Sequence, residues 1–158
     1  MIENEIDSII KEIANAINDI IPVKWVNAYF YGEVGEHKES HTIGMYFYNK
    51  KQRKYMDFTE IPDVYPEFNG FSLQFSKLNT LTLNLYDLFS ESGMKPWEAI
   101  LIEIDKKGKL KLNFSYDWFS IGEDEFARKI LWANRTFGFT PQKGGYAEKI
   151  INSHKGDK

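Results

Sequence analysis

WEAILIEIDKKGKLKLNFSYDWFSIGEDEFARKILWANRTFGFTP, residues 97–141, is the stretch that decides the fold. In its first half, apolar side chains occupy every second position of two short runs: Ile100, Ile102 and Ile104, then Leu110, Leu112, Phe114 and Tyr116. Asp-Lys-Lys-Gly at 105–108 is typical of a tight turn, in which Gly108 is free to take a positive φ. The stretch therefore predicts a half-buried antiparallel hairpin.

A mixed polar and aromatic segment, Asp-Trp-Phe-Ser at 117–120, follows the hairpin. A helix is then predicted from Gly122 to Thr136, with apolar positions at Phe126, Ile130, Trp132, Ala133 and Phe137. Acidic residues crowd its first turn, where the helix dipole favours them. Such a segment at the end of a rigid hairpin is typical of a binding site, and equally of an ordinary strand-to-helix connection.

Composition narrows the class of protein. The 158-residue chain is long enough for one domain with a substantial core, and aromatic residues reach 16%, which hints at a binding surface. The absence of cysteine excludes disulfides, thiolate metal sites and thiol nucleophiles. A net charge of −3 provides no positive field for nucleic acid. Without a membrane-spanning run or a basic leader, we expect a soluble, cytoplasmic protein.

The first half of the chain predicts one helix and three strands. Isoleucines recur at spacings of three and four through residues 2–21, and Pro22 ends this amphipathic helix, which we expect to pack on a sheet. Strands at 24–34, 42–48 and 53–58, joined by polar turns, predict an antiparallel meander. The two prolines in residues 61–66 argue against both a regular helix and a central strand there.

Residues 68–92 fit two patterns. Leucines at 81, 83 and 85 alternate as in a strand, yet a helical stripe also fits: Phe71, Phe75, Leu78, Leu81, Leu85, Leu88 and Phe89. The length of the segment favours a helix, since strands rarely run so far. Gly93 then suits the position after the helix end, with Pro96 beyond it.

These elements predict an α+β fold. We expect an antiparallel sheet of about five strands, a meander plus a hairpin, packed with an N-terminal, a central and a C-terminal helix. Residues 1–141 are predicted to form a single domain. Residues 142–158 are predicted to be a polar tail, either a short docked helix or flexible.

No catalytic constellation is visible. His37 and His41 have the spacing of two metal ligands on one helix face, but they lie in a predicted loop and strand start without a third ligand. Asp117 and Asp124 have no nucleophile or base partner, so helix capping is the simpler interpretation. Nucleophile-elbow, P-loop and GxGxxG patterns are absent. We therefore predict no catalytic residue, no metal site and no cofactor.

An ordered set of motifs resembles the YezG-type antitoxins. A helix ending in Ile-Pro precedes a Trp- and Tyr/Phe-rich strand (residues 20–31), followed by Leu-Tyr-Asp-Leu-Phe (85–89), Lys-Pro-Trp (95–97) and Phe-Ser-Tyr-Asp (114–117). A helix carrying Arg128 and Trp132 then ends in Gly-Phe-Thr-Pro (138–141). Each motif is mostly hydrophobic pattern, but their order is specific and covers about residues 2–141.

The resemblance implies an immunity protein, not an enzyme. YezG-type antitoxins are encoded beside secreted bacterial toxins, including LXG-domain toxins and nuclease effectors of type VII secretion. The implied partner is a cognate toxin, held through its C-terminal nuclease domain and blocked without chemistry. Two alternatives stay open: a small carboxylate-dependent enzyme such as a hydrolase, and an adaptor that chaperones a secreted protein before export.

A nuclease partner must carry a basic surface to hold nucleic acid, so an acidic and aromatic surface suits it. The chain concentrates both features in six residues, which we predict to contact the partner: Asp117, Trp118, Phe119, Glu123, Asp124 and Glu125. Core packing and helix capping are the competing interpretation of the same residues. No direct contact with nucleic acid or membrane is expected.

Overall fold

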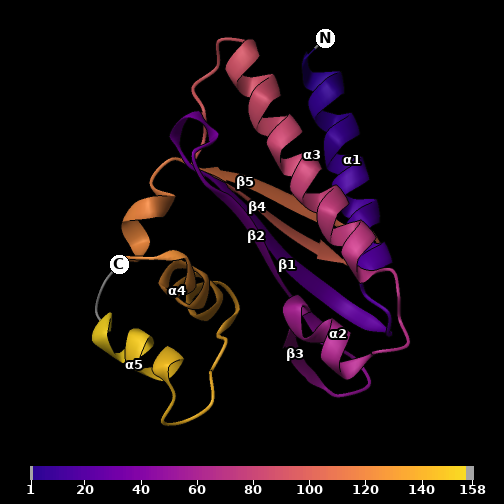
Figure 1. Ribbon diagram of the computed structural model, residues 1–158, viewed down its shortest axis with the longest axis vertical. Helices are drawn as coiled ribbons and strands as arrows, with labels where there is room; N and C mark the ends of the chain where they lie inside the picture. The colour runs from indigo at the N-terminus through magenta and orange to yellow at the C-terminus, as the bar shows by residue number, and fades with distance from the viewer. Residues whose placement is uncertain (1, 156–158) are drawn as a thin grey trace. The chain divides into compact units, whose positions relative to one another are not determined.

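A computed structural model describes residues 2–155 of the chain, which divides into two compact units, Met1–Tyr116 and Asp117–Lys158. The first unit carries a five-stranded antiparallel sheet and three α-helices, and the second carries two α-helices after a short 3-10 turn (Figure 1). The predicted α+β class is confirmed, with its antiparallel sheet and its N-terminal, central and C-terminal helices. A single domain over residues 1–141 stays a prediction.

The sheet has the strand order β3-β2-β1-β4-β5, and every neighbouring pair is antiparallel. Its strands are β1 (Trp25–Val34), β2 (His41–Asn49), β3 (Lys54–Asp57), β4 (Ala99–Asp105) and β5 (Leu110–Ser115). The central strand joins the predicted meander to the predicted hairpin, because Phe30 of β1 lies opposite Met45 of β2 and Ile102 of β4.

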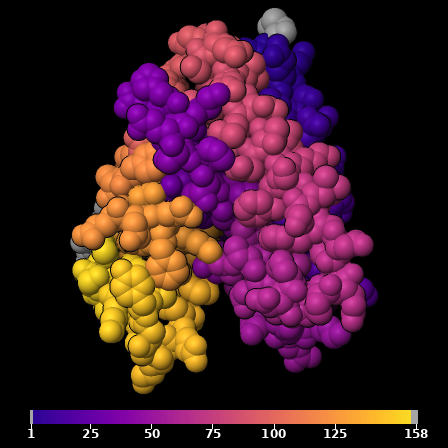
Figure 2. All heavy atoms as spheres, in the orientation of Figure 1, coloured from indigo at the N-terminus to yellow at the C-terminus, as the bar shows by residue number. Residues whose placement is uncertain are grey.

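Two long helices, α1 (Ile2–Ile20) and α3 (Phe71–Glu91), run side by side across one face of this sheet (Figure 1). The isoleucine stripe of α1 is the reason: Ile13, Ile17 and Ile20 are fully buried in one core cluster with alternate residues of the strands. Figure 2 shows the side chains of α3 and of the short α2 (Ile61–Val64) as a continuous layer on this face. The helix predicted for residues 68–92 is thus confirmed.

Two local expectations in the first unit are wrong. Residues 61–64 form one turn of helix. Proline is tolerated there because Pro62 lies in the first turn, where a backbone N–H would have no intrahelical acceptor. Tyr116 was expected to point inward with Phe114, but β5 ends at Ser115 and Tyr116 is 44% exposed. The described chain also has 3-10 turns in the β1–β2 loop (η1, Glu36–Lys38) and after β3 (η2, Phe58–Glu60).

The second unit contains η3 (Trp118–Ile121), α4 (Glu125–Phe137) and α5 (Tyr146–Ser153). The two helices pack through a small cluster formed by Ala127, Ile130, Leu131 and Ile150. Helix α4 is capped by Gly138, whose φ of 73° is the left-handed conformation that glycine adopts without strain. Residues 142–155, expected to be a polar tail, include α5.

Candidate functional site

The predicted contact residues begin at a tight turn in the second unit. The backbone carbonyl of Asp117 accepts hydrogen bonds from Ser120 N at 3.3 Å and Ser120 Oγ at 2.7 Å, which closes η3. Gly122 then passes so close to α4 that a Cβ on it would lie 2.8 Å from Arg128 N. A larger residue would push the turn away from the helix, so this glycine fixes where the turn presents its side chains.

The start of α4 is fixed by a side-chain cap. Asp124 Oδ1 accepts a hydrogen bond from Ala127 N at 2.8 Å, so its carboxylate satisfies one of the unpaired amides of the first turn. Arg128 connects this turn to η3, because its guanidinium carbon lies 4.9 Å from the centroid of the Phe119 ring and Nη1 donates to Gly122 O at 3.5 Å. Arg128 holds Phe119 in place at the surface.

A depression of about 650 Å³ opens beside this turn. It is lined by Asp117, Phe119, Ser120, Ile121, Gly122, Glu123, Arg135 and His154. Three of the six predicted contact residues therefore meet at one hollow: Asp117, Phe119 and Glu123. Asp117 and Glu123 are exposed and Phe119 is half-buried, so two acidic residues and an aromatic residue line the same hollow.

The other three predicted residues lie elsewhere. Trp118 is only 2% exposed, and its ring meets that of Trp132 edge to face at 6.4 Å, so its side chain belongs to the packed interior. Asp124 is exposed, but its carboxylate accepts the capping hydrogen bond of α4. Glu125 is exposed in the first turn of α4 and does not line the depression.

Sequence reasoning missed Arg135 and His154 as neighbours of these residues. His154 Nδ1 lies 2.9 Å from Ile150 O and 3.2 Å from Ser153 Oγ, which holds the ring at the end of α5. A short docked helix was one of the two alternatives expected for residues 142–158, and the packing of Ala147, Ile150 and Ile151 in the small cluster of the second unit accounts for α5. The hollow can thus bind a partner group through hydrogen bonds and charges of both signs.

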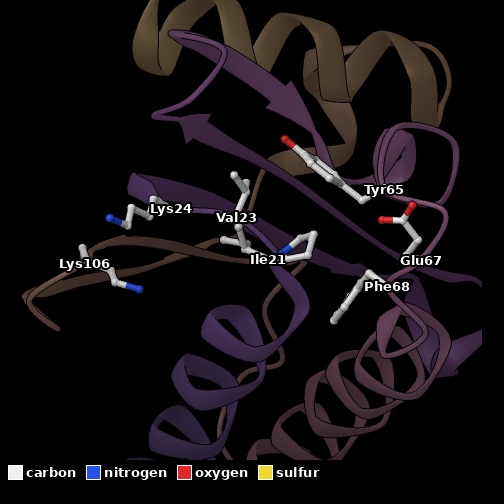
Figure 3. A pocket seen from close by; sticks show the side chains of 8 residues that line it. Ile21, Val23, Lys24, Tyr65, Glu67, Phe68 and Lys106 are labelled. Carbon is white, nitrogen blue, oxygen red and sulfur yellow. The ribbon is translucent and has the colours of Figure 1, made fainter.

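A second concavity, a groove of about 600 Å³, lies wholly within the first unit (Figure 3). It is lined by Ile21, Pro22, Val23, Lys24, Tyr65, Glu67, Phe68 and Lys106. Figure 3 shows Lys24 and Lys106 on one side, Tyr65, Glu67 and Phe68 on the other, with Ile21 and Val23 between them. Nothing in the sequence pattern had pointed to this groove, because its residues come from three separate segments.

The histidines considered as metal ligands take separate roles. His41 Nδ1 lies 3.2 Å from Asn79 Oδ1 at the start of β2, whereas the exposed His37 Nε2 is 3.5 Å from Glu36 Oε1. Within residues 2–155 there is no group of three or more His, Asp or Glu side chains that could hold a metal ion. Over the same residues, no helix combines the length and the apolar character needed to cross a membrane.

Comparison with known proteins gives a consistent result over nearly the whole chain. The sequence model of the family described as "Immunity protein YezG-like" matches residues 6–151, from α1 to α5. The Type VII secretion system protein EsaG of Staphylococcus aureus (strain NCTC 8325 / PS 47) is 28% identical over 145 residues, covering 89% of this chain and 86% of that protein.

Two Bacillus proteins are similar over comparable lengths. Immunity protein YezG of Bacillus spizizenii (strain ATCC 23059 / NRRL B-14472 / W23) is 22% identical over 157 residues, covering 92% of each chain. Immunity protein YezG of Bacillus subtilis (strain 168) is 24% identical over 148 residues, covering 89% of this chain and 93% of that protein. The similarity therefore includes both compact units and the α5 segment.

Proposed function

Because the chain belongs to the YezG-like immunity protein family, we propose that it binds and neutralises one cognate secreted bacterial toxin by stoichiometric protein–protein binding, without chemistry. The family match over residues 6–151 carries this proposal. Neutralisation takes place in the cytoplasm of the producing cell. Since one relative is named a type VII secretion system protein, a toxin exported by such a system is the partner we propose.

The proposed target on the toxin is a nuclease domain, which must present a basic surface to its substrate. The hollow in the second unit supports this choice, because two exposed acidic residues, Asp117 and Glu123, line it together with the half-buried Phe119. Aromatic side chains anchor protein interfaces, and complementary charge speeds their association. We propose that four of the six predicted residues contact the toxin: Asp117, Phe119, Glu123 and Glu125. Asp124 would instead fix the start of α4 as its cap, and the buried Trp118 would support the turn through packing.

The stoichiometry of inhibition tests the mode of action. The C-terminal domain of the toxin encoded beside this gene is purified, and its cleavage of DNA and RNA is titrated with this chain. Inhibition that is complete at one equivalent supports neutralisation by binding. Inhibition well below one equivalent would instead indicate an enzyme that modifies the toxin. Failure of this chain to rescue cells expressing the toxin would overturn the immunity function itself.

Charge reversal tests the proposed surface. The variant Glu123→Lys/Glu125→Lys leaves the Asp124 cap intact, and we expect its toxin affinity to fall on the order of tenfold at low salt, with a smaller loss at high salt. Glu3→Lys/Glu5→Lys is the matched control, because it makes the same charge change near the start of α1. Equal affinities of the two variants would remove this surface from the interface.

A further inference from the structure

We propose that the groove in the first unit is a second toxin-docking site, which receives an extended toxin segment carrying an apolar side chain next to a carboxylate. This inference rests on the proposed function, since it takes the toxin as the partner. The lysines of the groove would bind an acidic part of the toxin, whereas the carboxylates of the hollow in the second unit are proposed to bind a basic part. The inference therefore predicts two chemically different contacts with one partner.

The floor and walls of the groove are extensions of the core. Ile21 is only 7% exposed, and Val23, Tyr65 and Phe68 are half-buried and packed against the main core cluster. A segment lying in the groove would therefore cover apolar surface that the fold leaves partly open to water. An apolar side chain is the group that gains most from this contact.

The two aromatic walls are fixed before any partner arrives. Tyr65 Oη accepts a hydrogen bond of 2.8 Å from Asn49 Nδ2, and Asn49 is fully buried. The backbone joins the two walls, because Phe68 N donates to Tyr65 O at 3.1 Å. Asn49 is itself held, since its Oδ1 accepts from Lys51 N and Gln52 N, each at 3.0 Å. A preformed wall loses little conformational entropy when it binds.

The charged side chains of the groove determine which way round the toxin segment binds. Lys24 is exposed on one side of the groove, together with Lys106, whose Nζ lies 5.3 Å from the centroid of the Trp25 ring and donates to Asn18 Oδ1 at 3.4 Å. Glu67 lies across the groove from both lysines (Figure 3). A carboxylate on the ligand would meet two cations at the lysine side and repulsion at the Glu67 side. The segment is thus oriented as well as held.

Charge reversal at Lys24 tests the inference. We expect Lys24→Glu to lower affinity for the purified toxin domain on the order of tenfold, mainly through slower association, because this side chain is exposed. Lys77→Glu, an exposed residue of α3 outside the groove, is the matched control and should bind as the wild type does. Unchanged thermal midpoints show that both variants are folded. Equal binding of Lys24→Glu and Lys77→Glu would overturn the groove assignment while leaving the immunity function intact.

Photo-crosslinking identifies the segment that occupies the groove. A photoreactive amino acid replaces the exposed Glu67, and the toxin peptide that crosslinks is sequenced by mass spectrometry. We expect a single peptide containing an apolar residue beside Asp or Glu, and no toxin crosslink from the same group at Ser76 on α3. A peptide without a carboxylate, a crosslink to a second copy of this chain, or no crosslink would contradict the inference. If the wild-type chain neither binds nor neutralises the toxin, the proposed function fails and the groove assignment falls with it.

Discussion

The two compact units of this chain differ in how many large side chains they bury in their cores. The largest fully buried side chains of the described residues all belong to the first unit, among them Trp97, Phe30 and Ile17. In the second unit the helix cluster is small, and the rings of Phe126 and Tyr146 stack on each other while 43% and 65% exposed. A small unit buries a smaller share of its surface, so it depends more on caps and single contacts. The first unit therefore holds the large core, whereas the second leaves more of its aromatic surface exposed.

The largest effects should come from truncating the two cores. Ile17→Ala removes a fully buried side chain of α1 and should cost about 2–5 kcal/mol of global unfolding free energy. Ile130→Ala, in the cluster between α4 and α5, should raise amide hydrogen exchange in those helices more than in the sheet.

Hydrogen exchange with mass spectrometry and urea unfolding measure both outcomes. Ile6→Ala is the control for the first unit, because Ile6 lies on the same helix and is half-buried, so it should cost less than Ile17→Ala. If Ile130→Ala raised exchange equally in the sheet and in α4, the two units would unfold as one, and the contrast between them would be lost.

A smaller effect is expected where glycine permits close approach. A Cβ on Gly44 would lie 2.2 Å from Cε2 of the buried Tyr31 ring, and one on Gly122 would lie 2.8 Å from Arg128 N. Gly44→Ala and Gly122→Ala should each cost about 1–3 kcal/mol, because packed neighbours must move. The losses should appear in the sheet and in α4, respectively. Gly145→Ala is the control, since its new Cβ would meet nothing nearer than 3.4 Å. A stability equal to that of this control would show that the neighbours adjust freely.

Much of the scaffold follows from periodicity. The isoleucine stripe of α1 and the alternation in β4 and β5 are local patterns, and they specify their elements because each buries one face. The pairing of β1 with β4, which joins meander to hairpin, has no local signal because it depends on contacts between distant segments. The turn at 61–64 escaped prediction for a different reason, since proline forbids a helix interior but not a helix start.

The candidate site was less predictable than the fold. Composition identified the acidic and aromatic stretch, and Asp117, Phe119 and Glu123 do line one hollow. It could not separate Trp118, which is buried, from Phe119, which is half-exposed, because both are aromatic neighbours on a short turn. The groove of the first unit combines residues near 21, 65 and 106, and only the tertiary fold brings these segments together.

A still smaller effect is expected at the cap of α4. Asp124→Ala removes the acceptor of Ala127 N and should cost about 1 kcal/mol, whereas Asp124→Asn should retain most of the stability because asparagine also caps helices well. Hydrogen exchange should localise the loss to the first turn of α4. If alanine and asparagine behaved alike, the cap would contribute little, and the second unit would depend on its apolar cluster more than we propose.

At neutral pH the last effect is silent: it is a loss of stability in alkali that originates in the first unit. Burial raises the pKa of Tyr29 to about 12, with Tyr55 and Glu103 adding to the shift, and burial followed by Asp57 and Glu60 raises the pKa of Tyr46. Because the folded state keeps these protons when the unfolded chain, with a pKa near 10, releases them, this stability is complete below about pH 10 and declines above it. For Tyr29 the decline extends to about pH 12.

Urea midpoints measured from pH 8 upward should fall beyond pH 10, and the fall should be shallower in Tyr29→Phe and shallower still in Tyr29→Phe/Tyr46→Phe. Tyr146→Phe, an exposed residue of α5, is the control and should follow the wild-type curve. A wild-type slope in the double variant would show that the alkaline loss arises elsewhere than in these two tyrosines of the sheet.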